Sequence, residues 1–260
     1  MKLALCQLNS VWENAKESLS LCDAAIDGFI ASYGTPDVFV FPEFFNTGYT
    51  MDTSFSEKED GQTVAWMKKK AAAIGCAIAG SVPIEENGKT YNRFFFVSET
   101  GILGKYDKHH LFTYAGEDKS YTPGNSHAVF YYRGWNISLG VCYDLRFPVW
   151  LRNKGCAYDL MLMVANWPDV RIADSRILLS ARALENCAFY AFCNRLGVDK
   201  SCNYNGMSAV MNTKGELISQ EVEAGGSSFV VAPIDKEALE DFRQKFPVWK
   251  DTDKFEIFTD

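Results

Sequence analysis

The chain has 260 residues, of which 47% are hydrophobic and 23% charged, and its formal net charge is −7. This apolar content is enough for a sizeable core and argues against a mainly disordered chain. The acidic balance, without any basic patch, argues against nucleic acid as the main partner, although local cations can still bind an anionic substrate.

No apolar run approaches the length of a membrane span, and the first nine residues turn polar too soon for a signal peptide. These features predict a cytoplasmic protein with no membrane partner. The eight cysteines are scattered, without a Cys-x-x-Cys pair, and the three histidines lack the spacing of zinc ligands. We therefore expect reduced thiols, mostly in the core, and no bound metal.

In the first part of the chain, strand-like and helix-like segments alternate. Strands are predicted at residues 3–8, 37–44 and 76–84, and helices at 13–31 and 63–74. The spacing within the first helix predicts that one face buries Leu19, Ala25, Ile26 and Phe29. Glycine-bearing turns divide residues 87–110 and 127–144, which is typical of antiparallel strands.

In the second part, helices are predicted at residues 147–154 and 172–187, the second with Leu178, Ala181 and Leu184 facing inward. Further strands are predicted at 158–168, 188–195, 207–219 and 227–235. No linker, repeat or low-complexity segment divides the chain, so we expect a single domain over residues 1–260. Its fold class is α/β with mixed sheets, and helices on the outer faces of two packed sheets would fit.

The segment GVCYDLRFP places Cys142 where a buried strand ends, a position that can hold a nucleophile rigidly and still expose it. A cysteine nucleophile needs a base, oxyanion donors and groups that orient the substrate. The backbone N–H of Tyr143 is a candidate oxyanion donor, and Arg146 is a candidate partner for a carboxylate. The alternatives are a structural core cysteine and an arginine in a surface ion pair.

Two further charged residues follow strand-like runs. Glu43 comes directly after VFVFP, where a carboxylate is costly unless it is paired or used, and it is a candidate base. Lys108 is a candidate to stabilise an oxyanion. The alternatives are a solvated turn glutamate and a surface lysine. His109 and His110 suggest a Cys–His pair, but neither has a partner carboxylate at a recognisable spacing, so we expect a partly exposed turn.

Taken together, FPEFFNTGY, KYDKHHLF and GVCYDLRFP resemble the motifs of the nitrilase superfamily of carbon–nitrogen hydrolases, and the resemblance runs almost end to end. It implies a nitrilase-like fold, a four-layer α-β-β-α sandwich with two mixed sheets, that needs no metal and no organic cofactor. It also implies a cysteine nucleophile within a catalytic triad of Glu43, Lys108 and Cys142.

Within the superfamily, CYDLRFP, VANWPDVR and LLSARALEN are most similar to the omega-amidases. These enzymes hydrolyse the terminal amide of dicarboxylic acid monoamides such as 2-oxoglutaramate, 2-oxosuccinamate and succinamate. The resemblance implies a second glutamate, which Glu117 matches, and we expect it to orient Lys108 and the substrate. We expect Arg146 to bind the distal carboxylate of this small anionic amide. The pocket is predicted to be lined by Tyr49, Asn166 and Trp167, the last of which would also suit the core.

The resemblance also implies a homodimer. The segment 236–260 is rich in aromatic residues and is predicted to pack on its own subunit or across the dimer. One departure lies on the long helix, where close relatives carry a tryptophan a few residues before the two leucines. This chain has Ala173-Asp174-Ser175-Arg176 instead, and whether the Ser175 region alters subunit packing stays open.

Other interpretations stay open at this point. The nearest is another branch of the superfamily, such as an N-carbamoyl amide hydrolase, which would release carbon dioxide with ammonia. A nitrile hydrolase is a further alternative, as is a non-catalytic binding protein on the same fold. The complete set of Glu43, Lys108 and Cys142 argues against the last. A redox-sensing role for Cys142 lacks a resolving cysteine nearby in the sequence.

Overall fold

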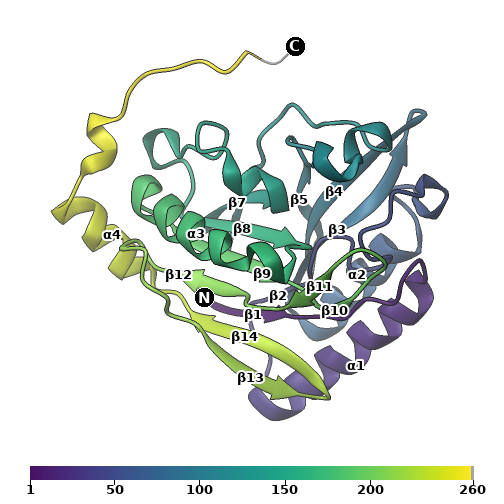
Figure 1. Ribbon diagram of the computed structural model, residues 1–260. Helices are drawn as coiled ribbons and strands as arrows, with labels where there is room; N and C mark the ends of the chain where they lie inside the picture. Colours follow the sequence, from purple (N-terminus) through teal and green to yellow (C-terminus); the bar gives the residue numbers. More distant parts are fainter. Residues whose placement is uncertain (259–260) are drawn as a thin grey trace.

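The computed structural model describes residues 1–258 and consists of two β-sheets packed face to face between layers of helices (Figure 1). Helices α1 (Ala15–Tyr33) and α2 (Gln62–Ile74) cover the outer face of one sheet. Helix α3 (Ile172–Asn186) covers the outer face of the other. This α-β-β-α sandwich is the predicted fold.

The first sheet has seven strands in the order β13-β14-β1-β2-β3-β4-β5. Strands β1, β2 and β3 run parallel, and the other neighbours pair antiparallel, so the sheet is mixed as predicted. In chain order the strands are β1 (Lys2–Cys6), β2 (Val38–Val40), β3 (Ala77–Glu86), β4 (Lys89–Ser98), β5 (Gly101–Asp107), β13 (Gln220–Ala224) and β14 (Ser227–Pro233).

The second sheet has five strands in the order β12-β9-β8-β7-β6, of which β7, β8 and β9 run parallel. A separate hairpin, β10 with β11, follows β9. The strands are β6 (Val129–Tyr132), β7 (Trp135–Val141), β8 (Leu160–Ala165), β9 (Phe189–Asn194), β10 (Leu196–Val198), β11 (Asn203–Asn205) and β12 (Ala209–Met211).

The core forms two layers because the strands of the first sheet are buried on both faces. Leu3 and Leu5 of β1 belong to the cluster between the two sheets, whereas Ala4 and Cys6 belong to the cluster under α1 and α2. This alternation is the two-residue period of a strand. All eight cysteines are free thiols and five of them are fully buried, as the sequence predicts.

The predicted helix over residues 147–154 is wrong. The strand β7 runs instead into a short 3₁₀ helix, Cys142–Arg146, followed by isolated turns. The side chain of Asn153 donates to the carbonyl O of Tyr158 (2.8 Å) and accepts a hydrogen bond from its N–H (3.0 Å). These side-chain bonds satisfy the backbone in place of helical ones, so tertiary contacts override local helix propensity.

The inward face predicted for α3 is correct for Leu178, which packs against the core, but the buried face as a whole is displaced by about one residue. The helix itself lies where predicted, but its buried side chains are Ser175, Leu179, Arg182, Ala183 and Asn186, whereas Leu184 is 48% exposed. Apolar residues stand on two neighbouring stripes of this helix, so their spacing alone does not choose between them.

A fourth helix, α4 (Lys236–Lys245), was not predicted. Asp235 caps its N-terminus, accepting a hydrogen bond from the N–H of Glu237 at 2.9 Å. Arg243 ties the helix to the end of the second sheet by donating to Asp159 Oδ1 (2.7 Å) and to the carbonyl O of Tyr158 (2.7 Å). Within the subunit, α4 thus contacts the second sheet.

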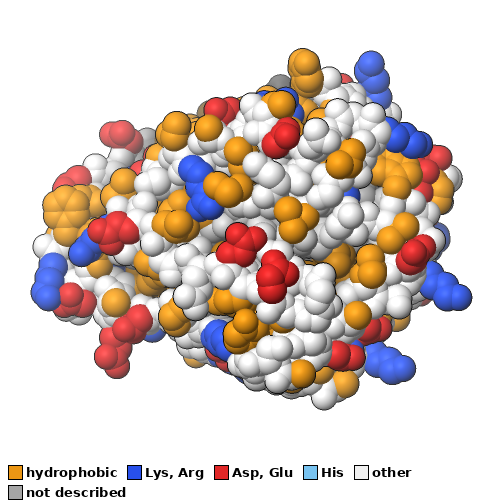
Figure 2. Space-filling view, turned by 60° about the horizontal axis from the view of Figure 1, so that its bottom comes forward, with side chains coloured by type: hydrophobic (Ala, Val, Ile, Leu, Met, Phe, Trp, Pro, Cys, Tyr) orange, Lys and Arg blue, Asp and Glu red, His pale blue; other side chains and the backbone are white. Residues whose placement is uncertain are grey.

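The surface carries charges of both signs. On the face shown in Figure 2, Lys and Arg side chains alternate with Asp and Glu side chains, and hydrophobic side chains are scattered among them. That face therefore lacks the continuous basic patch that is typical of a nucleic-acid-binding surface. Within residues 1–258, no helix is long and apolar enough to cross a membrane.

Candidate active site

The three residues of the predicted triad and the predicted pocket residue Asn166 follow the carboxyl ends of strands. Glu43 lies just beyond β2, Lys108 follows β5, Cys142 follows β7 and Asn166 follows β8. Since β1–β3 and β7–β9 are parallel, the loops at their carboxyl ends meet at one edge of the sandwich. This edge is where ligands bind in open α/β sheets.

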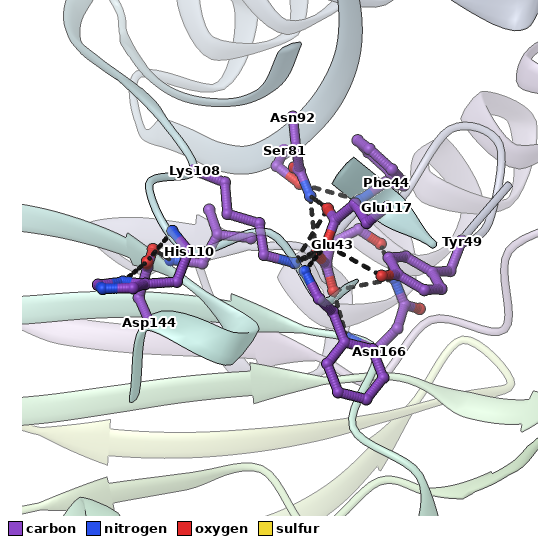
Figure 3. Close-up of polar contacts among 12 residues, drawn as sticks. Glu43, Phe44, Tyr49, Ser81, Asn92, Lys108, His110, Glu117, Asp144 and Asn166 are labelled. Carbon is purple, nitrogen blue, oxygen red and sulfur yellow. Dashed lines mark hydrogen bonds and ion pairs between the residues drawn. The ribbon is translucent and has the colours of Figure 1, made fainter. Parts of the chain in front are cut away.

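The structure brings Glu43, Lys108 and Glu117 into direct contact (Figure 3). The Nζ of Lys108 donates to Glu43 Oε1 at 2.9 Å and to Glu117 Oε2 at 2.8 Å. All three side chains are fully buried, so the cluster holds one positive and two negative charges away from water. Buried charges of this kind are costly to stability and are retained where they are used.

Electrostatics keeps Lys108 protonated. Burial alone would lower its pKa, but the negative charges of Glu117 and Glu43 outweigh burial and hold the pKa well above its usual value. Lys108 is therefore an ammonium group over the whole physiological range. It is suited to stabilise negative charge and not to accept a proton.

Neutral donors complete the hydrogen bonding of the two carboxylates. The backbone N–H of Asn166 donates to Glu43 Oε2 at 2.9 Å, and the N–H of Phe112 donates to Glu117 Oε2 at 2.6 Å. The hydroxyl of Tyr49 donates to the same Glu117 oxygen at 3.0 Å. Tyr49 and Asn166, which the sequence predicted only as pocket lining, therefore also hold the two carboxylates in place.

Asn92 was missed by the sequence prediction. Its Nδ2 donates to Glu43 Oε1 at 2.7 Å and to Glu117 Oε1 at 3.2 Å, bridging the two carboxylates (Figure 3). Asn92 lies on the same face of β4 as Phe94 and Phe96, which contribute to the core between the sheets. A polar residue on an otherwise apolar, inward-facing stripe was the available signal.

Cys142 has a backbone conformation that side chains rarely adopt. Its φ is +44°, in the left-handed region, at the step from β7 into the 3₁₀ helix. Such strain clusters at functional sites, where the surroundings hold it in place. Phe44, next to Glu43, also has a positive φ, of +48°. The predicted base and the predicted nucleophile thus both stand at strained turns.

Burial raises the pKa of the Cys142 thiol well above its usual value, and the negative charge of Glu43 raises it further. The charge of Lys108 and a hydrogen bond from the backbone N–H of Asn166 act in the opposite direction. The raised pKa means that Cys142 is a thiol near neutral pH and needs a neighbouring base to become a nucleophile.

The pH dependence of alkylation tests this protonation state. Because the pKa of Cys142 is raised, its rate of modification by iodoacetamide should still be increasing at about pH 9, above the ordinary thiol pKa of about 8.5. The measurement is the modified fraction of the Cys142 peptide by mass spectrometry against pH. A rate that reaches its plateau below about pH 8 would contradict the prediction.

A second network joins the nucleophile turn to the lysine loop. Asp144, fully buried, accepts hydrogen bonds from the hydroxyl of Tyr106 (2.7 Å) and the N–H of Val141 (3.0 Å). It also accepts hydrogen bonds from the N–H of His110 (2.9 Å) and from Nδ1 of the same residue (2.8 Å), shown in Figure 3. The two histidines lie in a partly exposed turn, as expected, and His110 does have a partner carboxylate. That partner lies 34 residues away in the chain, so sequence spacing could not reveal it.

Replacing Asp144 with Asn should misplace Cys142 relative to Lys108. The amide keeps only one acceptor oxygen, so buried donors lose their partner and the free energy of unfolding should fall by about 1–3 kcal/mol. We expect kcat to fall while KM changes little, because the turn and not the binding surface is disturbed. Asp159→Asn is the matched control, since Asp159 is a buried carboxylate that pairs with Arg243 and Lys236 outside the site. It should lower stability with an unchanged kcat, and an equal fall of kcat in both variants would contradict the role.

A cavity of about 720 Å³ opens onto Cys142. Its wall includes Tyr49, Asn166 and Trp167, the three residues predicted to line the pocket. Trp167 is only 3% exposed and packs on Phe192, so it belongs to the core as well as to the wall. The Glu43–Lys108–Glu117 cluster is fully buried and lies outside the wall.

Arg146 and Tyr143 also line this cavity. The guanidinium of Arg146 lies over the Trp167 ring at 4.9 Å, and its Nη2 donates to Asp174 Oδ2 at 2.7 Å. Arg146 therefore forms the ion pair that was one of its two alternatives and also faces the cavity, whereas its binding of a carboxylate stays a prediction. Cys202 lies in the wall of the same cavity as Cys142.

The site offers acid–base and nucleophilic groups, and the described residues contain no group of three or more His, Cys, Asp or Glu side chains arranged to hold a metal ion. The buried carboxylates are occupied by Lys108 and neutral donors. The arrangement can therefore deprotonate a thiol, direct it at an electrophilic carbon and stabilise an oxyanion.

Comparisons with known proteins show the family and support the fold. A family model described as carbon–nitrogen hydrolase matches residues 2–244. The omega-amidase YafV of Escherichia coli strain K12 is 40% identical over 99% of both chains. The 2-oxoglutaramate amidase of Bacillus subtilis is 33% identical over 84% of this chain and 85% of its own. Among solved structures, the CN-hydrolase superfamily protein XC1258 of Xanthomonas campestris superposes with a TM-score of 0.91 at 34% identity over 99% of both chains.

Proposed function

The chain belongs to the carbon–nitrogen hydrolase family, and we propose that it is an omega-amidase. It hydrolyses the terminal amide of a dicarboxylic acid monoamide, such as 2-oxoglutaramate, 2-oxosuccinamate or succinamate, to the diacid and ammonia. The observation that carries the proposal is Cys142, which lies in the wall of a cavity, close enough to the buried Glu43–Lys108–Glu117 cluster for the charges of that cluster to act on its thiol. The relationship to YafV supports the substrate class.

The proposed reaction begins with proton transfer from the Cys142 thiol to Glu43. The thiolate attacks the amide carbon, and the ammonium of Lys108 and the N–H of Tyr143 stabilise the tetrahedral oxyanion. Glu43 returns the proton to the departing ammonia, which leaves a thioester on Cys142. Glu43 then activates a water that releases the acid and restores the thiol. General acid–base help of this kind contributes about 10²–10⁴-fold, and one oxyanion donor about 10²–10³-fold.

Glu117 and Arg146 position the catalytic lysine and the substrate, respectively. Glu117 orients Lys108, because both of its oxygens accept hydrogen bonds from that ammonium group. Arg146 binds the distal carboxylate of the substrate with the N–H groups that Asp174 leaves free. A cationic wall explains how an acidic protein selects an anionic amide.

A hydrolase of N-carbamoyl amides is the second candidate, because the same cysteine chemistry cleaves both kinds of C–N bond. A purely structural use of the fold is disfavoured. Replacing a buried ion cluster with apolar residues is often neutral or stabilising, so a scaffold has little reason to keep Glu43, Lys108 and Glu117. The homodimer, the single domain over residues 1–260 and the cytoplasmic location stay predictions.

A substrate panel tests the proposed function. The purified chain should release ammonia from 2-oxoglutaramate and succinamate at rates well above those for a nitrile or an N-carbamoyl amide of similar length. Ammonia is measured by a coupled assay, and carbon dioxide is measured alongside it. If only the N-carbamoyl amide were hydrolysed, with release of carbon dioxide and ammonia, the second candidate would replace the proposed function.

A further inference from the structure

Arg171 lies in the wall of the Cys142 cavity, in the short 3₁₀ turn Asp169–Arg171 that leads into α3. Its N–H donates to the carbonyl O of Pro168 at 3.1 Å, and its carbonyl O accepts a hydrogen bond from Trp167 Nε1 at 2.8 Å. The backbone of Arg171 is therefore fixed to the cavity wall from both sides.

The side chain of Arg171 has an aromatic support and, among residues 1–258, no charged partner. Its guanidinium lies over the Phe112 ring at 5.5 Å. Across residues 1–258 it forms no ion pair and donates no hydrogen bond, whereas a guanidinium carries five N–H donors. Stacking on a ring leaves the in-plane N–H groups free, so the planar fork can accept a carboxylate.

Phe112 connects this guanidinium with the catalytic cluster. The N–H of Phe112 donates to Glu117 Oε2 at 2.6 Å, and its ring meets the Tyr143 ring edge-on at 5.0 Å. Tyr143 directly follows Cys142. The support under Arg171 is thus fixed by the same residues that hold Lys108 and the nucleophile turn.

The other two cations of the cavity wall are less suited to the same task. The Nη2 of Arg146 is already bound to Asp174 at 2.7 Å, which occupies part of its fork and offsets its charge. Lys200 lies over the Trp12 ring at 5.2 Å and offers a compact ammonium group without a planar fork.

We propose that Arg171 is the principal carboxylate-binding residue of this site. Its free fork holds the distal carboxylate of the amide substrate bidentately while Cys142 attacks the amide carbon, and Arg146 contributes a second, weaker contact. The inference rests on the proposed omega-amidase function and names the residue that selects for the acid group.

A matched pair of substrates separates carboxylate binding from catalysis. Succinamate and butyramide have the same four-carbon chain, and only succinamate carries a carboxylate. Arg171→Gln should lower kcat/KM for succinamate by about 10- to 100-fold, mainly through KM, because a charge-assisted pair is lost. Turnover of butyramide should be unchanged. Arg171→Lys should recover part of the lost kcat/KM for succinamate, since it restores the positive charge without the planar fork. Arg146→Gln should lower this kcat/KM less than Arg171→Gln does.

Arg152→Gln is the control for the loss of one positive charge, because Arg152 lies outside this cavity and donates to the carbonyl O of Glu185. It should leave both substrates unaffected. Equal losses for succinamate and butyramide in Arg171→Gln would overturn the proposal, because they would indicate a disturbed fold. A larger loss for Arg146→Gln than for Arg171→Gln would overturn it too.

Calorimetric binding of succinate to the Cys142→Ala protein keeps the two proposals distinguishable. We expect the Kd to rise by about 10- to 100-fold when Arg171→Gln is added. If the parent hydrolysed no ω-amide but bound succinate in this Arg171-dependent way, the proposed function would fail and the carboxylate site would stand. Binding that did not depend on Arg171, or no binding, would overturn the carboxylate site whatever the activity.

Discussion

Replacing Cys142 with alanine should reduce ammonia release from succinamate by at least about 10³-fold, because residues that act as one catalytic unit fail together when the nucleophile is lost. The remaining groups, Lys108 and Glu43, can bind and polarise the amide but cannot form a thioester. Stability should change little, since alanine adopts the positive φ at this position no less readily than cysteine. The measurements are turnover by ammonia release and the free energy of unfolding in urea.

Cys202→Ala is the matched control, because Cys202 is also a free thiol in the wall of the same cavity. It should keep the parent's turnover. Hydroxylamine adds a second readout, since it competes with water for a thioester and gives a hydroxamate only when that intermediate forms. A Cys142→Ala protein that still produced hydroxamate would show that the acyl group is carried elsewhere.

Positions after strand-like runs made Glu43, Lys108 and Cys142 candidates, and the resemblance to the nitrilase superfamily implied that they form a triad. Glu43, Lys108 and Glu117 do meet in space, as their shared hydrogen bonds show. Their complete burial was not predictable, because it depends on how the two sheets close over the cluster.

The residues that the prediction missed act across the fold. In the sequence, Asp144 looks like an ordinary turn residue. In the fold, it contacts Tyr106, on strand β5 of the first sheet, and His110, in the loop that follows β5. Arg171 belongs to a motif that was recognised, but only the three-dimensional structure shows that it has no ion partner within the described part of the chain. Sequence patterns locate strand ends, and tertiary contacts decide what meets there.

The hydrophobic spacing was also insufficient in α3, where two different inward faces were equally consistent with it. Leu178 and Leu179 are adjacent, so α3 could turn either stripe inward. The observed face includes Arg182, whose Nε donates to the carbonyl O of Leu145 at 3.1 Å. A buried arginine bound to the nucleophile turn is a tertiary contact that hydrophobic spacing does not encode.

Replacing Lys108 with methionine should affect both catalysis and folding. Loss of the ammonium removes an oxyanion donor, so kcat should fall by about 10²–10³-fold. The substitution also leaves Glu43 and Glu117 buried without a cation, and breaking a buried ion pair from one side costs about 3–5 kcal/mol. Lys105→Met, on strand β5 just before Lys108, is the matched control. Its pair with Glu59 is exposed and worth only about 0–1 kcal/mol, so turnover and stability should stay close to those of the parent.

The pH dependence of stability gives the Lys108→Met variant a distinct signature. Two like charges sharing one buried site favour uptake of a proton in the folded state. The folded variant then binds more protons than the unfolded chain near neutral pH, so its free energy of unfolding should decrease as the pH rises from 5 towards 8. Adding Glu117→Gln removes one of the two charges and should restore part of the stability without restoring turnover. A Lys108→Met protein that kept both its stability and its kcat would remove Lys108 from the mechanism, whereas a loss of stability alone would make the cluster structural and leave catalysis to Glu43 and Cys142.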